Sequence, residues 1–365
     1  MSALLLALQF TLCAGLIARA GWVLSHSGER IAALTGLSGG WIGLAMLATA
    51  TSLPELASGV SAVALLEAPN LAVGNALGAC VFNLLLLALI DVLQREEPLY
   101  RRASDEHLLS AAFGVVMLGL VAMAVLMAEA MPSLLHVGIY SPMLLVMYLL
   151  ALRSVHGHQR TTNRSRAAAD SLADARAPGP DSPTSASTPA GAASTDTDRG
   201  AGATADSPLA QEVRRFALAA LVVLAAGIWL SALADQLSSA AGWNRSFVGT
   251  LFMAVVTTLP EMAVTLSALR LGAVDMAIGN LLGSNLFNVL ILAIDDAAYL
   301  QGTLLVDASP AHAGTAMAAV VMTGLVIIGL VMRPRGRVLR LASWVSIGVA
   351  ATYVLAATLV FVRGG

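Results

Sequence analysis

Apolar residues along this chain come in ten long runs separated by short polar stretches. Each run holds about 20 residues or more, enough for an α-helix to cross the roughly 30 Å of hydrocarbon in a bilayer. The runs therefore predict transmembrane helices. The expected spans are 3–24, 38–66, 71–93, 107–130, 134–153, 212–235, 246–270, 275–299, 311–332 and 339–362.

A segment of different composition divides these spans into five and five. Residues 154–210 contain no aromatic residue, Ile or Met, and are dense in Ser, Thr, Ala, Pro, Asp and Arg. Such a stretch cannot bury enough apolar surface to order itself, so we expect a disordered linker. The chain then divides into a first five-helix repeat (1–153), the linker (154–210) and a second five-helix repeat (211–365).

Composition agrees with a membrane protein. Of the 365 residues 58% are hydrophobic and 12% are charged, whereas soluble domains carry about 25% charged residues. The first apolar run lacks a basic segment before it and is too long for a signal peptide, so we expect it to be retained. The Ala-rich composition, with Arg and no Lys, indicates a bacterial inner membrane, and nothing in it suggests a nucleic-acid partner.

The arginines predict the orientation. They gather in alternate loops on the side of the linker, with Arg245 and Arg363 as the exceptions. Because basic loops stay in the cytoplasm, the linker is expected there and both termini outside. The residues on which this rests are Arg30, Arg95, Arg101, Arg102, Arg270, Arg333, Arg335, Arg337 and Arg340.

Two blocks of sequence occur twice. "TSLPELASGVSA" at 51–62 matches "TTLPEMAVTLSA" at 257–268, and "AVGNALGACVFNLLLLALID" at 72–91 matches "AIGNLLGSNLFNVLILAIDD" at 277–296. The copies lie five spans apart, an odd number, so they have opposite orientations in the membrane. We therefore predict an all-α membrane protein of ten transmembrane helices, arranged as two inverted five-helix repeats. Proline should break helices 2 and 7.

The first block of each copy carries oxygen ligands. A carboxylate at mid-bilayer costs roughly 2.5–3.5 kcal/mol, so Glu55 and Glu261 indicate function. Hydroxyls three and four residues earlier share a helix face with each carboxylate. The prolines should also free carbonyls in the preceding turn. Oxygen atoms without sulfur or imidazole suit hard cations such as Ca²⁺, Na⁺ or Mg²⁺. The remaining predicted ligands are Thr51, Ser52, Thr257 and Thr258, with the carbonyls of Ala48 and Ala254.

Together the paired blocks resemble the alpha repeats of the cation/Ca²⁺ exchanger superfamily. The resemblance implies that Asn83, Asn288 and Ser284 face the ion sites and that spans 1 and 6 slide to alternate access. Ala79 and Cys80 depart from the family pattern of Ser and Asn, so one hydroxyl expected at a Na⁺ site is missing.

These features predict a Ca²⁺/cation antiporter, most simply a Na⁺/Ca²⁺ exchanger, rather than an enzyme. Antiport requires that two kinds of cation compete for one site. Ca²⁺ or several monovalent ions can each neutralise the pair of glutamates, but not both at once. A Ca²⁺/H⁺ antiporter of the same fold stays open as an alternative, and a cation channel is a less favoured one. We expect no cofactor, Ca²⁺ and Na⁺ (or H⁺) as substrates, the lipid bilayer as surroundings, and function as a monomer.

Three further carboxylates fall at span ends. Asp91 and Asp296 match in the repeat, and Asp295 is adjacent. At such positions we expect solvation at the interface or helix capping rather than ion binding.

Overall fold

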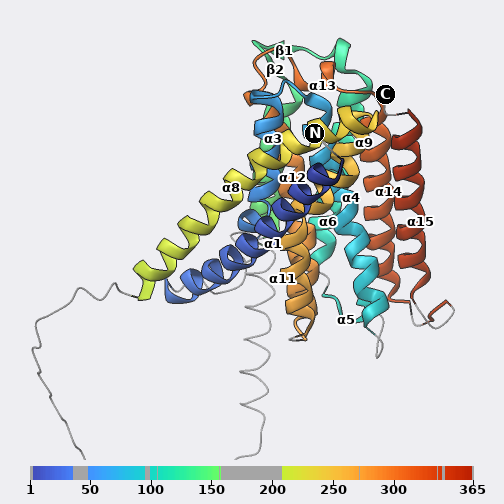
Figure 1. Ribbon diagram of the computed structural model, residues 1–365. Coiled ribbons are helices and arrows are strands. Elements are labelled where there is room, and N and C mark those ends of the chain that lie inside the picture. The colour runs from blue at the N-terminus through green and yellow to red at the C-terminus, as the bar shows by residue number, and fades with distance from the viewer. Residues whose placement is uncertain are drawn as a thin grey trace, which may run out of the picture.

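The computed structural model describes residues 3–35, 48–94, 99–104, 106–155, 157, 208–270, 272–334, 336–338 and 342–363. Nearly all of these residues are helical (Figure 1). The longer helices are α1 (Ala3–Leu34), α3 (Leu53–Ala64), α4 (Pro69–Leu93), α6 (Glu106–Leu126), α8 (Pro208–Ala241), α11 (Leu259–Arg270), α12 (Val274–Ala298), α14 (Ala311–Met332) and α15 (Trp344–Arg363), with one more at Tyr140–Val155. The shorter elements are α5 (Leu99–Arg102), η1 (Ala128–Ala130), β1 (Ser133–Leu134), β2 (Val137–Gly138), α9 (Arg245–Phe247), the π-helix η2 (Val248–Met253), α10 (Ala254–Thr257) and α13 (Leu304–Asp307).

Seven of the described helices are long and apolar enough to cross a membrane, and one bent pair makes an eighth. The helix Tyr140–Val155 is apolar but shorter. The chain is therefore a helical membrane protein. Residues 38–47 of the expected second span, and residues 156 and 158–207 of the expected linker, lie outside the described residues. The total of ten spans stays a prediction.

The helix is interrupted at the same position in both copies of the proline motif. Ser52 has φ −89° and ψ 10°, and Thr258 has φ −81° and ψ 6°. Pro54 and Pro260, two residues later, have no N–H to donate to the preceding turn. In the second copy the helical segments before and after Thr258 differ in direction by 45°.

Helices α4 and α12 form the centre of the molecule, and both are apolar around most of their circumference. Glycines bring α4 against η2, backbone to backbone. A Cβ at Gly78 would lie 2.3 Å from the Thr250 carbonyl oxygen, and one at Gly249 would lie 2.7 Å from that of Leu71. Larger residues at either glycine would separate the two elements.

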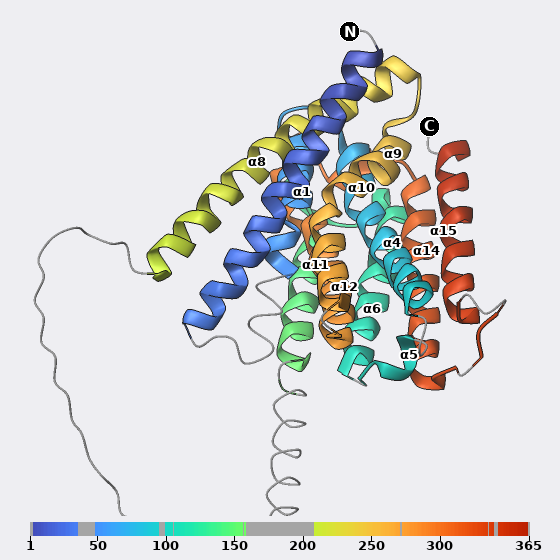
Figure 2. The ribbon, with the colours of Figure 1, turned by 60° about the horizontal axis from the view of Figure 1, so that its bottom comes forward.

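Helices α1 and α8 lie side by side at a strong tilt to the rest of the bundle (Figures 1 and 2). Each presents a glycine to one proline motif. A Cβ at Gly21 would lie 2.3 Å from Pro260 Cγ, and one at Gly227 would lie 2.7 Å from Ala57 Cβ and 3.3 Å from the Pro54 carbonyl oxygen. The long helix of each half of the chain therefore packs on the proline motif of the other half.

Both of these helices extend further than the hydrophobic pattern indicated. α1 continues to Leu34, so Arg30 is helical rather than in a loop, and α8 begins at Pro208. The extensions carry polar residues that pair with one another, since Arg30 Nη1 lies 2.9 Å from Glu212 Oε1. A pattern based on hydrophobicity ends where these polar residues begin.

Asp91 and Asp296 hold distant parts of the chain together. Asp91 accepts hydrogen bonds from the Leu99 and Ser343 amides and the Ser346 hydroxyl. Asp296 accepts equivalent bonds, from Leu304 N, Gly138 N and Ser141 Oγ. Both side chains are completely buried, so the expected solvation at the interface is wrong. Instead, each carboxylate accepts the first amide of the following short helix, Leu99 of α5 or Leu304 of α13.

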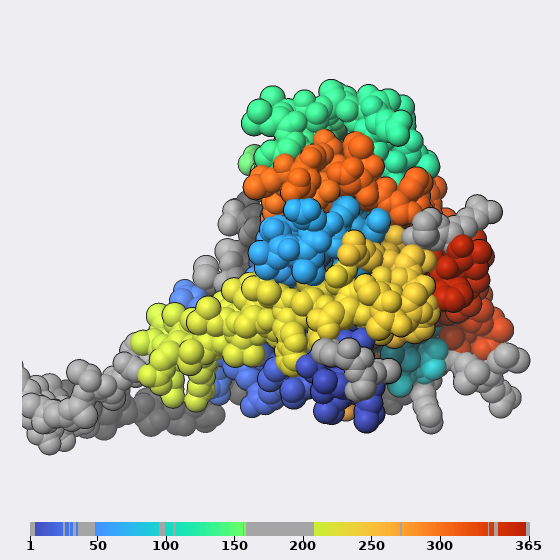
Figure 3. All heavy atoms as spheres, turned by 45° about the horizontal axis from the view of Figure 1, so that its top comes forward, coloured from blue at the N-terminus to red at the C-terminus, as the bar shows by residue number. Residues whose placement is uncertain are grey.

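The two copies of the repeat also make matching contacts at the centre of the bundle. Cys80 and Asn285 stand 205 positions apart, and the same shift relates Asp91 to Asp296 and each of their partners. Cys80 Sγ lies 3.7 Å from the Asn285 carbonyl oxygen, and Asn285 Nδ2 donates to the Cys80 carbonyl oxygen at 3.3 Å. Equivalent positions in the two copies therefore touch each other. On one end face, bands from the first and second halves of the chain alternate (Figure 3).

Candidate ion-binding site

The two proline motifs meet across a direct hydrogen bond. Ser52, at the helix break of the first copy, donates from Oγ to Glu261 Oε1 of the second copy at 2.8 Å. Glu261 lies in the first turn of α11, three residues after the break at Thr258. The breaks thus place a hydroxyl of one half beside the carboxylate of the other.

Glu55 lies in the first turn of α3, and its surroundings form a second cross-link. The Thr257 hydroxyl donates to Asn75 Oδ1 at 3.1 Å, and Asn75 Nδ2 lies 3.3 Å from the Glu55 carbonyl oxygen and 3.0 Å from Ser58 Oγ. Neither carboxylate oxygen of Glu55 accepts a hydrogen bond. Asn75 was not among the predicted ligands, although its place in the repeated block could have suggested it.

The two carboxylates are completely buried and close enough for their charges to interact. In a low-dielectric interior, two negative charges at short range are costly unless a cation lies between or beside them. Glu261 Oε2 has no hydrogen-bond partner, like both oxygens of Glu55. Three carboxylate oxygens are thus available for an ion.

The amides and the hydroxyl implied by the resemblance lie on the central helices α4 and α12. Asn83 donates from Nδ2 to Asn285 Oδ1 at 3.1 Å, which leaves Asn83 Oδ1 without a partner. Ser284 Oγ and both polar atoms of the Asn288 side chain are also unpartnered. Since buried polar groups are nearly always hydrogen-bonded, so many free atoms indicate a role beyond packing.

The hydroxyls of the motifs are less free than expected. Thr51 Oγ1 donates to the Ala48 carbonyl oxygen at 3.1 Å, and Thr258 Oγ1 to that of Ala254 at 2.6 Å. Both carbonyls also accept a backbone N–H, from Ser52 and Thr258 respectively. The expectation that proline frees these two carbonyls is wrong, because the proline removes the donor to a different carbonyl in each turn.

Ala79 is buried at the position where the second copy has Ser284. The first copy therefore offers one hydroxyl fewer. Among the described residues, no group of three or more His, Cys, Asp or Glu side chains is arranged to hold a metal ion. A cation here would rely on two carboxylates and neutral oxygens.

Asp295 is a third aspartate whose surroundings differ from those that the sequence predicted. We expected a solvated span end, yet the side chain is completely buried and neither carboxylate oxygen has a hydrogen-bond partner. It faces the bare backbone of Gly59, where a Cβ would lie 2.6 Å from Oδ2. Gly59 is four residues, about one helical turn, beyond Glu55 on α3. The equivalent position in the first copy is Ile90, so this third carboxylate belongs to one copy only.

A helical bundle of membrane-spanning length that buries paired carboxylates among hydroxyls and amides defines a membrane transport protein for cations. Comparison with known proteins agrees. The model of the sodium/calcium exchanger protein family matches residues 5–153 and 213–362, most of the chain. The chain belongs to this family, which is one of transporters rather than enzymes.

The individual relatives have low sequence identity to this chain or match only a short part of it. The inner membrane protein YrbG of Escherichia coli is 26% identical over 262 residues, which cover 69% of this chain and 66% of that protein. The sodium/calcium exchanger MaX1 of Methanosarcina acetivorans is 44% identical over 59 residues, 16% of this chain and 17% of that protein. A structure of the sodium-calcium exchanger NCX_Mj matches with a TM-score of 0.58 at 21% identity, covering 97% of this chain and 98% of that one. This last match shows a shared fold.

Proposed function

We propose that this protein is a Ca²⁺/cation antiporter that exchanges Na⁺ for Ca²⁺ at a site built on Glu55 and Glu261. The observation that carries the proposal is the hydrogen bond from Ser52 to Glu261, which joins the two proline motifs. It makes one site out of two carboxylates that lie far apart in the sequence. The names of the sodium/calcium exchanger relatives support the choice of ions.

Competition for charge explains exchange. Two buried carboxylates match the charge of one Ca²⁺, and carboxylate, hydroxyl and amide oxygens are the ligands that Ca²⁺ and Na⁺ prefer. Either Ca²⁺ or several Na⁺ ions neutralise the pair, but not both sets at once. When the site is empty, the two carboxylate charges are uncompensated, and this opposes the conformational change of a transporter that carries no ion. The remaining proposed ligands are Thr51, Ser52, Thr257, Thr258, Asn83, Ser284 and Asn288.

The proposed architecture has two inverted repeats of five helices, with breaks in helices 2 and 7. Similar backbone angles at Ser52 and Thr258 support it. So do the matched capping bonds of Asp91 and Asp296 and the exchanged glycine–proline contacts of α1 and α8. A cytoplasmic linker at 154–210 and external termini complete the arrangement, within a bacterial inner membrane.

The ion that is exchanged for Ca²⁺ is Na⁺ in this proposal, with H⁺ as the alternative. Ala79 in place of a serine removes one hydroxyl from the first copy, which favours H⁺ as the alternative to Na⁺. A cation channel would commonly present a ring of ligands from several subunits. Here one chain supplies both carboxylates, which favours an antiporter.

Flux of ⁴⁵Ca²⁺ into proteoliposomes tests the proposal. Vesicles loaded with Na⁺ should accumulate Ca²⁺, and Glu55→Gln or Glu261→Gln should abolish the uptake. Uptake driven by a pH gradient without Na⁺ would move the coupling ion to H⁺. Absence of Ca²⁺ flux under either gradient, with correctly inserted protein, would refute the Ca²⁺ assignment.

A further inference from the structure

A basic cavity lies between α1 and α8, and neither of the paired glutamates lines it. Its volume is about 430 Å³. The residues that line it are Arg19, Trp22, Val23, His26, Ser27, Arg30, Glu212 and Arg215. Three arginines and one carboxylate line the cavity, so the lining carries an excess of positive charge.

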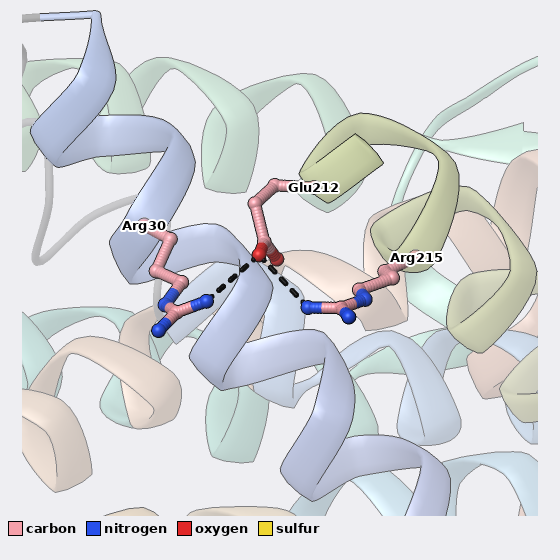
Figure 4. Close-up of polar contacts among 3 residues, drawn as sticks. All are labelled: Arg30, Glu212 and Arg215. Carbon is pink, nitrogen blue, oxygen red and sulfur yellow. Dashed lines mark hydrogen bonds and ion pairs between the residues drawn. The ribbon is translucent and has the colours of Figure 1, made fainter. Parts of the chain in front are cut away.

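Glu212 organises two of the arginines. Its Oε1 lies 2.9 Å from Arg30 Nη1 on α1 and 3.0 Å from Arg215 Nη1 on α8 (Figure 4). Glu212 is 7% exposed, whereas the two arginine side chains are 67% and 50% exposed. The carboxylate therefore fixes both guanidinium groups while most of their remaining N–H donors stay available.

Aromatic and basic groups continue along the same face of α1. Arg19 lies over the Trp22 ring, 5.2 Å from its centroid, and Trp22 stacks on His26 with the centroids 4.4 Å apart. From Arg30 to Arg19 the cavity follows 11 residues of α1, about 16 Å at 1.5 Å per residue. It therefore runs from the polar end of the helix into its apolar part.

We propose that this cavity binds the headgroup of an anionic phospholipid. Arginine provides paired donors that match phosphate oxygens, and basic pockets between transmembrane helices on the cytoplasmic side bind such headgroups. The predicted orientation puts the Arg30 end of α1 at the cytoplasmic surface. A cavity that extends from there along an apolar helix suits a lipid, which brings acyl chains with its phosphate, better than a free anion.

A lipid in this cavity would contact the two helices that pack on the proline motifs. α1 and α8 are the two helices whose glycines pack on Pro260 and Pro54, beside the candidate ion site. A lipid bound between them would hold the pair together from the membrane side. The inference is independent of which cations are exchanged.

Quenching of tryptophan fluorescence by brominated lipid tests the proposal. The full-length protein in phosphatidylcholine micelles is titrated with brominated phosphatidylglycerol or brominated phosphatidylcholine. The Trp22 contribution is the difference between wild type and Trp22→Phe. We expect phosphatidylglycerol to half-saturate this quenching at a mole fraction at least about fivefold lower than phosphatidylcholine, since one arginine near a membrane surface contributes about 1 kcal/mol.

Variants separate the cavity from general surface charge. Arg19→Gln and Arg215→Gln should each weaken the phosphatidylglycerol preference about fivefold. Arg153→Gln, an exposed arginine that does not line the cavity, should leave it unchanged. Equal quenching by both lipids in wild type, or an equal effect of Arg153→Gln, would overturn the proposal. Loss of the preference in millimolar inorganic phosphate would indicate a free-anion site and overturn it as well.

Discussion

At the scale of single residues, Ser52 links the two halves of the candidate site. Ser52→Ala removes a hydrogen bond to a charged group, worth about 1.5–3 kcal/mol, so Ca²⁺ affinity should fall roughly tenfold or more. Ser52→Thr keeps the hydroxyl, which the second copy has as Thr258, and should retain most of the affinity. The measurement is the Ca²⁺ concentration that half-saturates uptake. An unchanged value in Ser52→Ala would show that the bond does not support ion binding.

Two adjacent aspartates should behave in opposite ways. Asp296→Asn loses charge-assisted bonds to three donors, and we expect it to destabilise the protein by about 3–5 kcal/mol. Asp295→Asn removes a buried charge without partners, so stability should stay equal or rise. Thermal unfolding of both variants in detergent provides the comparison. A similar loss of stability in both would mean that Asp295 has a stabilising partner.

At the scale of helices, two glycines set how closely the tilted pair packs. Gly21→Ala places a Cβ against Pro260, and such overpacking typically costs about 1–3 kcal/mol. We expect slower transport, because α1 must shift away from the proline motif. Gly15→Ala on the same helix meets nothing within 4 Å and is the matched control. Equal transport rates in the two variants would contradict a functional contact at Gly21.

The sequence predicted these helices well where its pattern was strong. The proline motif marks the positions, Ser52 and Thr258, where the helix is interrupted, whereas the ten-span inverted repeat stays a prediction. The contacts that the two copies share, such as those of Asp91 and Asp296, were not predicted. The polar ends of α1 and α8 were missed, because their stability comes from pairing between helices, as at Arg30 and Glu212. The burial of Asp295 was missed for a related reason, since only tertiary packing brings Gly59 against it.

At the scale of the whole molecule, the orientation in the membrane is open to a labelling test. Gln301 is exposed after α12, and Gly157 is exposed near the start of the expected linker. The native Cys13 and Cys80 are completely buried and should not react. An impermeant maleimide should label Gln301→Cys on intact cells and Gly157→Cys only after lysis, because the linker is expected in the cytoplasm. The reverse pattern would invert the proposed topology.

We propose that both halves of the chain build one cation site. Equilibrium binding of ⁴⁵Ca²⁺ to the purified protein, with increasing Na⁺, measures this directly. We expect one Ca²⁺ per chain, displaced by Na⁺ and lost in Glu55→Gln and in Glu261→Gln alike. Two Ca²⁺ ions per chain, or binding that survives the loss of either glutamate, would contradict it.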